Sequence, residues 1–226
     1  MKTQLTKIIS CLAVLSATLP SLAQSSVEAL QAYTGGSTVS FGVAEGRTMG
    51  WLFQANSSIQ VTSLGVYDFG SWAGGWQTGH QVGIWDYSGD LLAETTVTSV
   101  APEGADDVRW VTLNSSSLNL TAGQFYYIEA YYPNGGAAVT DNLRYQATAV
   151  TTSPDITYVC PAWSNDGSFG DPNANQGFGY SNYAYFGPNF QFTAVTVPEP
   201  SALSFACLFG LTLLQLRYWK QTAAAI

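Results

Sequence analysis

The stretch HQVGIWDYSGDLLAETTVTSV, residues 80–100, carries two alternations of apolar and other residues on either side of a short polar turn. Val82 and Ile84 occupy every second position before the turn, and Leu92 belongs to the alternation after it. Side chains two residues apart lie on the same face of a strand, so each half predicts a strand with one buried face. The span Asp86–Asp90 between them is rich in turn-forming residues. The stretch therefore predicts a β-hairpin.

Similar alternations continue on both sides of this hairpin. In residues 58–69 the period is interrupted between Val61 and Leu64, which predicts a strand with a β-bulge. A Thr-Ala-Gly turn divides residues 109–132 into strand regions, of which QFYYIEAYY has the strongest β propensity. Further strands are predicted over residues 143–150, 156–159 and 189–195. Six to nine strands separated by Gly, Asn, Asp and Ser turns predict an all-β fold, an antiparallel β-sandwich or a jelly-roll-like arrangement.

Two segments of the body depart from this strand pattern. SSVEALQAY, residues 25–33, is the one window in the body that is compatible with a short helix. Residues 161–189 are rich in Gly, Asn and Tyr, so we expect a long loop, a type of segment that is often functional.

The charged residues are unevenly distributed. All 15 acidic residues lie between Glu28 and Glu199, whereas only three of the 7 basic residues do. Residues 24–200 therefore carry a net charge of −12 and contain no lysine. Such a surface repels phosphate backbones, so the sequence argues against nucleic acid as a partner.

The first 23 residues have the pattern of a secretion signal. Lys2 and Lys7 precede an apolar run, and small residues near its end predict cleavage after Ala23. The alternative, a lipoprotein signal at Cys11, has too few apolar residues ahead of it. Cys160 is then the one cysteine of the exported body outside the terminal apolar run, so we expect a buried thiol without a disulfide.

Residues 197–220 read VPEPSALSFACLFGLTLLQLRYWK. Pro198 and Pro200 cannot donate to a sheet ladder, so they end the last strand. Residues 201–216 carry no charge, and as a helix they would span about 24 Å, slightly less than the roughly 30 Å hydrocarbon core of a bilayer. We therefore expect a C-terminal transmembrane helix at about these positions.

Basic residues follow this apolar run. Arg217 and Lys220 can extend to the membrane interface, and the positive-inside rule places them in the cytoplasm and the acidic body outside.

The order of these features resembles the PEP-CTERM sorting signal, in which a Pro-Glu-Pro motif precedes a short apolar helix and a basic end. The resemblance implies that Pro198, Glu199 and Pro200 are recognised by an exosortase, a membrane transpeptidase-like enzyme, in a bacterium that makes exopolysaccharide. An ordinary C-terminal membrane anchor is the alternative. The resulting division of the chain is a signal peptide (1–23), a β-sandwich domain (24–196) and a sorting signal (197–220) with its helix at about 201–216.

The body resembles an uncharacterised extracellular β-sandwich family of the domain-of-unknown-function kind. The segments GWLFQANSSIQVTSLGVYD, GHQVGIWDYSGDLLAETTV, LTAGQFYYIEAYY and YFGPNFQF carry this resemblance. The hairpin pattern of the family is filled here by His80, Val82, Gly83, Trp85, Asp86, Gly89 and Leu91. The resemblance implies a sandwich and no particular chemistry.

Enzyme signatures are sparse in the body. His80 is the only histidine and no G-x-S-x-G motif accompanies it, so we expect a histidine hydrogen-bonded in the hairpin rather than a general base. Carboxylate pairs for glycoside hydrolysis would have to come from residues such as Asp86, Asp90, Glu94 and Glu129, most of which fall at turns. The sequence therefore predicts a protein that is not an enzyme.

The segment NDGSFGDPNAN offers oxygen ligands for Ca²⁺ from Asp166, Asp171 and Asn173. The spacing is not that of an EF-hand, because no glutamate closes it. Solvated turn side chains are the reading that we favour, so beyond this candidate Ca²⁺ site we expect no cofactor.

Aromatic residues are the other feature of the body. Trp85 and Trp110 lie in predicted strands, so we expect them in the core. Aromatic faces in loops can stack on sugar rings, but packing within the fold is the reading that we favour. The candidates for such stacking are Trp72, Trp76 and Trp163, the last with Tyr180, Tyr183 and Tyr185.

Together these features predict an exported bacterial protein of the cell envelope, cell surface or extracellular matrix. We expect it to be anchored in the inner membrane before processing, with an exosortase-type enzyme, the membrane and exopolysaccharide as partners. Its expected role is structural or adhesive. A carbohydrate-binding module is the first alternative, and a glycan-acting hydrolase is the second.

Overall fold

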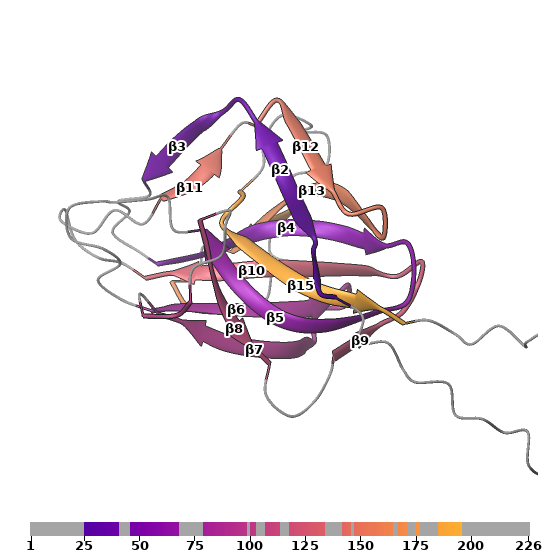
Figure 1. Ribbon diagram of the computed structural model, residues 1–226. Coiled ribbons are helices and arrows are strands. Elements are labelled where there is room, and N and C mark those ends of the chain that lie inside the picture. The colour runs from indigo at the N-terminus through magenta and orange to yellow at the C-terminus, as the bar shows by residue number, and fades with distance from the viewer. Residues whose placement is uncertain are drawn as a thin grey trace, which may run out of the picture.

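The computed structural model describes residues 25–40, 46–67, 79–98, 100–102, 107–113, 118–133, 142–145, 147–164, 167–170, 175–176 and 185–195. The regular structure in these residues is all β-strand, and none of them forms a helix (Figure 1). The strands are β1 (Val27–Glu28), β2 (Leu30–Thr34), β3 (Ser37–Ser40), β4 (Arg47–Ala55), β5 (Ile59–Tyr67), β6 (His80–Asp86), β7 (Leu91–Val97), β8 (Val108–Thr112), β9 (Leu118–Leu120), β10 (Phe125–Tyr132), β11 (Asn142–Tyr145), β12 (Ala149–Thr152), β13 (Ile156–Ser164), β14 (Asn175–Gln176) and β15 (Pro188–Ala194).

Two antiparallel sheets form the body of the fold. One has six strands in the order β14-β13-β4-β10-β6-β7, and the other has the order β1-β15-β5-β8, with β9 also paired to β5. In Figure 1, β15 and β5 cross in front of β4 and β10, so the two sheets lie face to face. We call the surface of the six-stranded sheet that is turned away from the other sheet its outer face.

Aromatic side chains fill the space between the sheets. Trp51 and Phe53 of β4 meet Phe190 of β15, with ring centroids 6.2 and 4.9 Å apart, and all three are fully buried. The Trp51 Nε1 donates to Pro188 O at 3.0 Å, so its polar atom is satisfied inside the core. Burial of one such side chain stabilises the fold by about 2 kcal/mol. These contacts join the two sheets into a β-sandwich.

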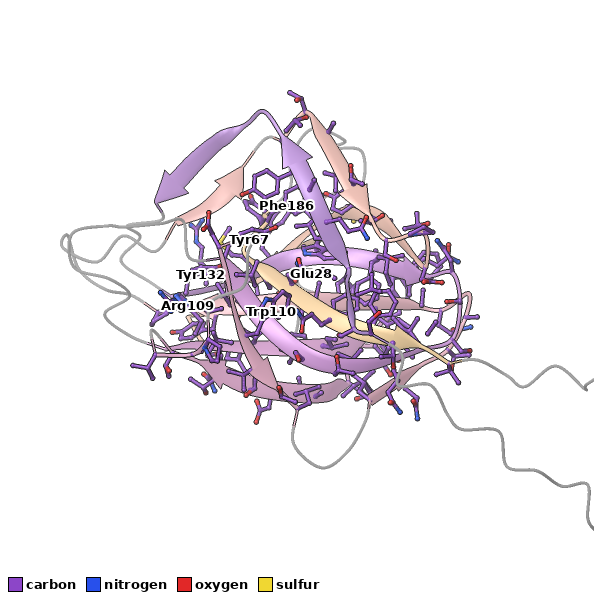
Figure 2. All side chains as sticks on the ribbon, in the orientation of Figure 1. Glu28, Tyr67, Arg109, Trp110, Tyr132 and Phe186 are labelled. Carbon is purple, nitrogen blue, oxygen red and sulfur yellow. The ribbon has the colours of Figure 1, made fainter. Side chains whose placement is uncertain are left out.

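Two smaller ladders cover one end of the sandwich. β2 pairs with β12 and β3 pairs with β11, at the top of Figure 1. Tyr33 of β2 contacts Tyr67 at the end of β5 and also Phe186, with ring centroids 5.5 and 6.1 Å apart. Figure 2 shows Tyr67 and Phe186 on this side of the sheets. The β2–β12 ladder is therefore packed on the sandwich through aromatic rings.

The hairpin that residues 80–100 predict is confirmed as β6 and β7. Gly89 has a φ of +94° in the turn between them, a conformation that favours glycine. The bulge is confirmed as well, because the register of β5 against β15 shifts between Val61 and Ser63.

Residues 25–33, the one window that is compatible with a short helix, form strands instead. Val27 and Glu28 pair with β15, and the residues from Leu30 onward pair with β12. These ladders are long-range, and the segment's own sequence contains no sign of its partners. Tertiary pairing therefore overrides the weak local helical pattern.

Two further expectations need correction. Residues 143–150 are not one strand, because β11 and β12 pair with different partners, β3 and β2. Residues 161–189 are not a single loop, because β13 continues to Ser164, β14 lies within the segment and β15 begins at Pro188. The described residues contain fifteen strands rather than six to nine, since several have only two to five residues.

The chain enters and leaves the sandwich at neighbouring positions. Val27 of β1 and Phe192 of β15 lie opposite each other in the antiparallel ladder. The Val195 amide donates to Ser58 O at 2.9 Å, while the Ser26 and Thr62 hydroxyls are 2.9 Å apart. The expected signal peptide and C-terminal helix lie outside the described residues. Within the part of the chain that the structure describes, no helix is long and apolar enough to cross a membrane.

Candidate functional site

The outer face of the six-stranded sheet carries a second apolar cluster besides the core. Leu52, Trp85, Tyr127, Cys160 and Ala162 are buried there, and they come from β4, β6, β10 and β13. Strand register brings them together, because Tyr127 lies opposite both Leu52 and Trp85. The expectation of a buried Cys160 thiol is confirmed, at 3% exposure.

Exposed aromatic side chains continue this cluster toward the β6–β7 turn. Tyr87 is 50% exposed and Phe125 is 37% exposed, and their ring centroids are 5.8 Å apart. The Tyr87 ring also lies parallel to the buried Tyr127 ring, at 6.0 Å and an interplanar angle of 4°. We call Tyr87, Phe125 and Tyr127 the aromatic platform. Phe125 and Tyr127 lie on β10, and Tyr87, in the β6–β7 turn, packs its ring against both of them.

Polar side chains lie beside the aromatic platform in strand register. Phe125 is opposite Gln54, and Gln54 is opposite Thr157 on the next strand. Opposite residues of an antiparallel ladder share a face, so the ring, the amide and the hydroxyl form one row on the outer face. The Gln54 amide donates to Gly123 O at 3.0 Å, and the Thr157 hydroxyl donates to Asn56 Oδ1 at 3.0 Å.

The turn next to the platform is acidic. Desolvation of the Asp86 carboxyl acts to raise its pKa, but hydrogen bonds from Asp90, Ser88 and Gly89 outweigh this effect and lower the pKa below its usual value. The Ser88 and Asp90 amides donate to Asp86 Oδ1 at 2.9 and 3.0 Å. Asp86 therefore fixes the turn that carries Tyr87.

A fully buried carboxylate lies farther along the same face. Glu129 of β10 has 0% exposure and is opposite Gly50 on one side and Gly83 on the other. A Cβ at Gly83 would come within 2.6 Å of the Trp85 ring and 2.9 Å of the Phe169 ring. Two glycines and the surrounding rings thus leave space for one long acidic side chain.

Residues 167–170, which we call the strap, cross the outer face beside Glu129. The Tyr131 hydroxyl donates to Gly167 O at 2.8 Å and the Thr48 hydroxyl donates to Ser168 O at 2.9 Å. The Phe169 ring packs on the Trp85 ring with centroids 5.0 Å apart. Two hydrogen bonds and one ring contact therefore hold the strap on the sheet.

His80 is fully buried at the start of β6. Its Nδ1 lies 3.0 Å from Tyr131 O, and its ring is 4.9 Å from the Tyr132 ring. The hydrogen bond that we expected within the hairpin is instead made to β10, and His80 is away from solvent.

The carboxylates named as candidates for hydrolysis are spread over the molecule. Asp86 and Asp90 share the β6–β7 turn. Glu94 and Glu129 lie on either side of Gly83 in strand register, but Glu94 is exposed whereas Glu129 is fully buried. The four carboxylates therefore do not gather at one open position.

Trp163 is the only candidate stacking tryptophan among the described residues. It is half-buried and packs against the core, and its ring meets the Tyr185 ring edge-on at 5.6 Å. Of the two tryptophans expected in the core, Trp85 is buried in the outer-face cluster, and Trp110 is half-buried against the core with its ring against Gly65. The other candidate site residues lie outside the described residues: Trp72, Trp76, Asp166, Asp171, Asn173, Tyr180, Tyr183, Pro198, Glu199, Pro200, Arg217 and Lys220.

No local pattern in the sequence indicates the aromatic platform. Tyr87 lies in a turn and Phe125 starts a strand, so only the pairing of β6 with β10 brings them together. The β-prone run that begins at Phe125 indicates a strand with many aromatic residues, but it does not indicate which face of that strand is exposed. Among the described residues, no group of three or more His, Cys, Asp or Glu side chains is placed to hold a metal ion.

No curated protein matches the chain. The model of a family described as a domain of unknown function (DUF4082) matches residues 34–186, which is more than half of the chain and includes the outer face described above. The chain therefore belongs to the DUF4082 family.

Proposed function

We propose that this protein is an exported bacterial protein of the cell surface or extracellular matrix, sorted through its PEP-CTERM-like tail. Its sandwich serves a structural or adhesive role in association with exopolysaccharide. The tail holds the protein in the inner membrane until an exosortase-type enzyme acts near Pro198, Glu199 and Pro200.

One structural relationship carries the proposal. Val27 and Phe192 lie opposite each other, so the segments that lead from the signal and to the tail join the sandwich at one edge. A domain attached in this way can be tethered at that edge while its remaining surface stays available to the surroundings. The acidic body also suits an exported protein, since net charge keeps such a protein soluble.

Fractionation of the native host tests this proposal. The full chain is compared with a variant that carries Pro198→Ala, Glu199→Ala and Pro200→Ala, and Thr196→Ala serves as the control outside the motif. We expect the wild-type chain and the control in the surface and matrix fractions, and the triple variant in the membrane fraction. An identical distribution of all three proteins would show that the motif does not direct sorting.

Carbohydrate binding is the second candidate function. The exposed Tyr87 and Phe125 rings, which contact each other beside polar side chains, favour it.

A further inference from the structure

We propose that the aromatic platform is a binding site for a neutral polysaccharide, with pyranose rings stacked on Tyr87 and Phe125 and hydroxyls bound along the Gln54–Thr157 row. This site rests on the proposed function in one respect, the association of the protein with exopolysaccharide.

The platform has the surface properties that stacking requires. Of the large apolar side chains exposed in the described residues, Tyr87 and Phe125 are the two aromatic ones, and they are neighbours. Tyr127 is fully buried behind Tyr87 and parallel to it, so the Tyr87 ring is held in a fixed plane. A ring that is ordered before binding loses little conformational entropy when a ligand arrives.

The polar row beside the rings favours a sugar over a purely apolar ligand. A pyranose presents an apolar C–H face and a rim of hydroxyl groups. Phe125 offers an apolar surface, and Gln54 and Thr157, in register with it, offer donors and acceptors on the same face. The Gln54 and Thr157 side chains are already positioned by hydrogen bonds to Gly123 and Asn56.

The acidic residues around the platform favour a neutral polymer as the ligand. Asp86 and Asp90 flank Tyr87, and residues 24–200 carry fifteen acidic side chains against three basic ones. A carboxylated or sulfated polysaccharide, or an anionic membrane surface, would be repelled at this site. A protein partner would need about 800 Å² of contact on each side, far more than two exposed aromatic side chains provide.

Affinity electrophoresis of the purified full chain in mild detergent tests the proposal. The neutral probes are hydroxyethylcellulose, laminarin, dextran and a galactomannan, and alginate is the anionic probe. We expect retardation by at least one neutral polymer and none by alginate. Tyr87→Ala and Phe125→Ala should each weaken binding about fivefold, because each removes one stacking surface. Tyr87→Phe keeps the ring and should bind within about twofold of wild type.

Val100→Ala is the matched control, since Val100 is an exposed apolar residue, 88% exposed, outside the platform. Circular dichroism and the thermal midpoint establish that each variant is folded. The proposal is overturned if no neutral polymer retards the wild-type chain, or if the Tyr87→Ala, Phe125→Ala double variant binds as wild type does. Platform-dependent binding to anionic phospholipid vesicles, or platform-dependent self-association in sedimentation, would also overturn it. Because the assay uses purified protein, its outcome is independent of whether the tail is sorted and processed.

Discussion

The side-chain amide of Asn189 hydrogen-bonds both backbone groups of Leu30, as a neighbouring strand would. Asn189 Oδ1 accepts a hydrogen bond from Leu30 N, and Asn189 Nδ2 donates one to Leu30 O, both at 3.0 Å in a buried position. The same Oδ1 accepts from Phe190 N at 2.9 Å. β1 ends at Glu28, so this amide extends the pairing with β15 to the first residue of β2. The Asn189 side chain thus helps to hold the start of the β2–β12 ladder, beside the backbone bonds of Ala29 to Phe190 and Ser153.

Asn189→Ala should therefore destabilise the fold by about 3 kcal/mol, because it leaves both backbone groups of Leu30 buried without these partners. Chemical denaturation measures the change in the free energy of unfolding. Asn119→Ala is the control, since its amide makes only an exposed 3.5 Å contact with Gln60 and its removal should cost less than about 0.5 kcal/mol. Equal midpoints for the two variants would contradict the role assigned to Asn189.

Close packing around Glu129 leads to a second prediction. Gly83→Ala should cost about 1–3 kcal/mol, because the new Cβ would press on the Trp85 and Phe169 rings. At Gly50 the new Cβ would meet the Ile128 carbonyl oxygen and the Glu129 Cα, which are backbone atoms and cannot turn aside, so Gly50→Ala should cost more. Thr96→Ala, on the exposed part of the edge strand β7, should be nearly neutral in the same thermal or chemical unfolding experiment.

Removing the hydrogen bonds that Thr48 and Tyr131 make to the strap should loosen it without unfolding the rest of the protein. Thr48→Val and Tyr131→Phe each remove one hydrogen bond to the strap, worth about 1 kcal/mol, while keeping most of the side-chain volume. Hydrogen exchange followed by mass spectrometry should show faster exchange in the peptide that contains residues 167–170, most of all in the double variant. Unchanged exchange there, or an equal increase across β4 and β10, would show that these hydroxyls do not hold the strap.

Acid should weaken the β6–β7 turn through Asp86. Its pKa is lower in the folded protein than its ordinary value of 3.8, so the carboxylate stabilises the fold above that value. This contribution is lost as the pH falls through the lower folded-state pKa, in the range below about pH 4. The effect should be small because Asp86 is near solvent. Denaturant midpoints between about pH 2 and 6 should fall less for Asp86→Asn than for wild type, and parallel curves would refute the assignment.

Local sequence patterns predict the parts of the fold that depend on neighbouring residues. The β6–β7 hairpin is such a part, because its alternation and the Asp86–Asp90 turn lie in one stretch. β4 is different. Every residue from Thr48 to Phe53 is buried, on both faces of the sheet, so no alternation of apolar and polar residues marks this central strand.

The candidate site depends still more on tertiary structure. Tyr87 and Phe125 are 38 positions apart, and their proximity follows from the register of β6 against β10. Asn189 likewise reads as an ordinary strand residue, and only the position of β2 reveals its hydrogen bonds. Composition indicates that aromatic residues are plentiful, but pairing decides which rings are exposed.

The intact mass of the mature protein from its native host tests the central claim most directly. Export and sorting predict a chain that begins at Gln24 and ends near Pro200, recovered from the surface or matrix fraction. A chain that still ends at Ile226 and stays in the membrane fraction would contradict the account and leave residues 197–220 as an ordinary anchor.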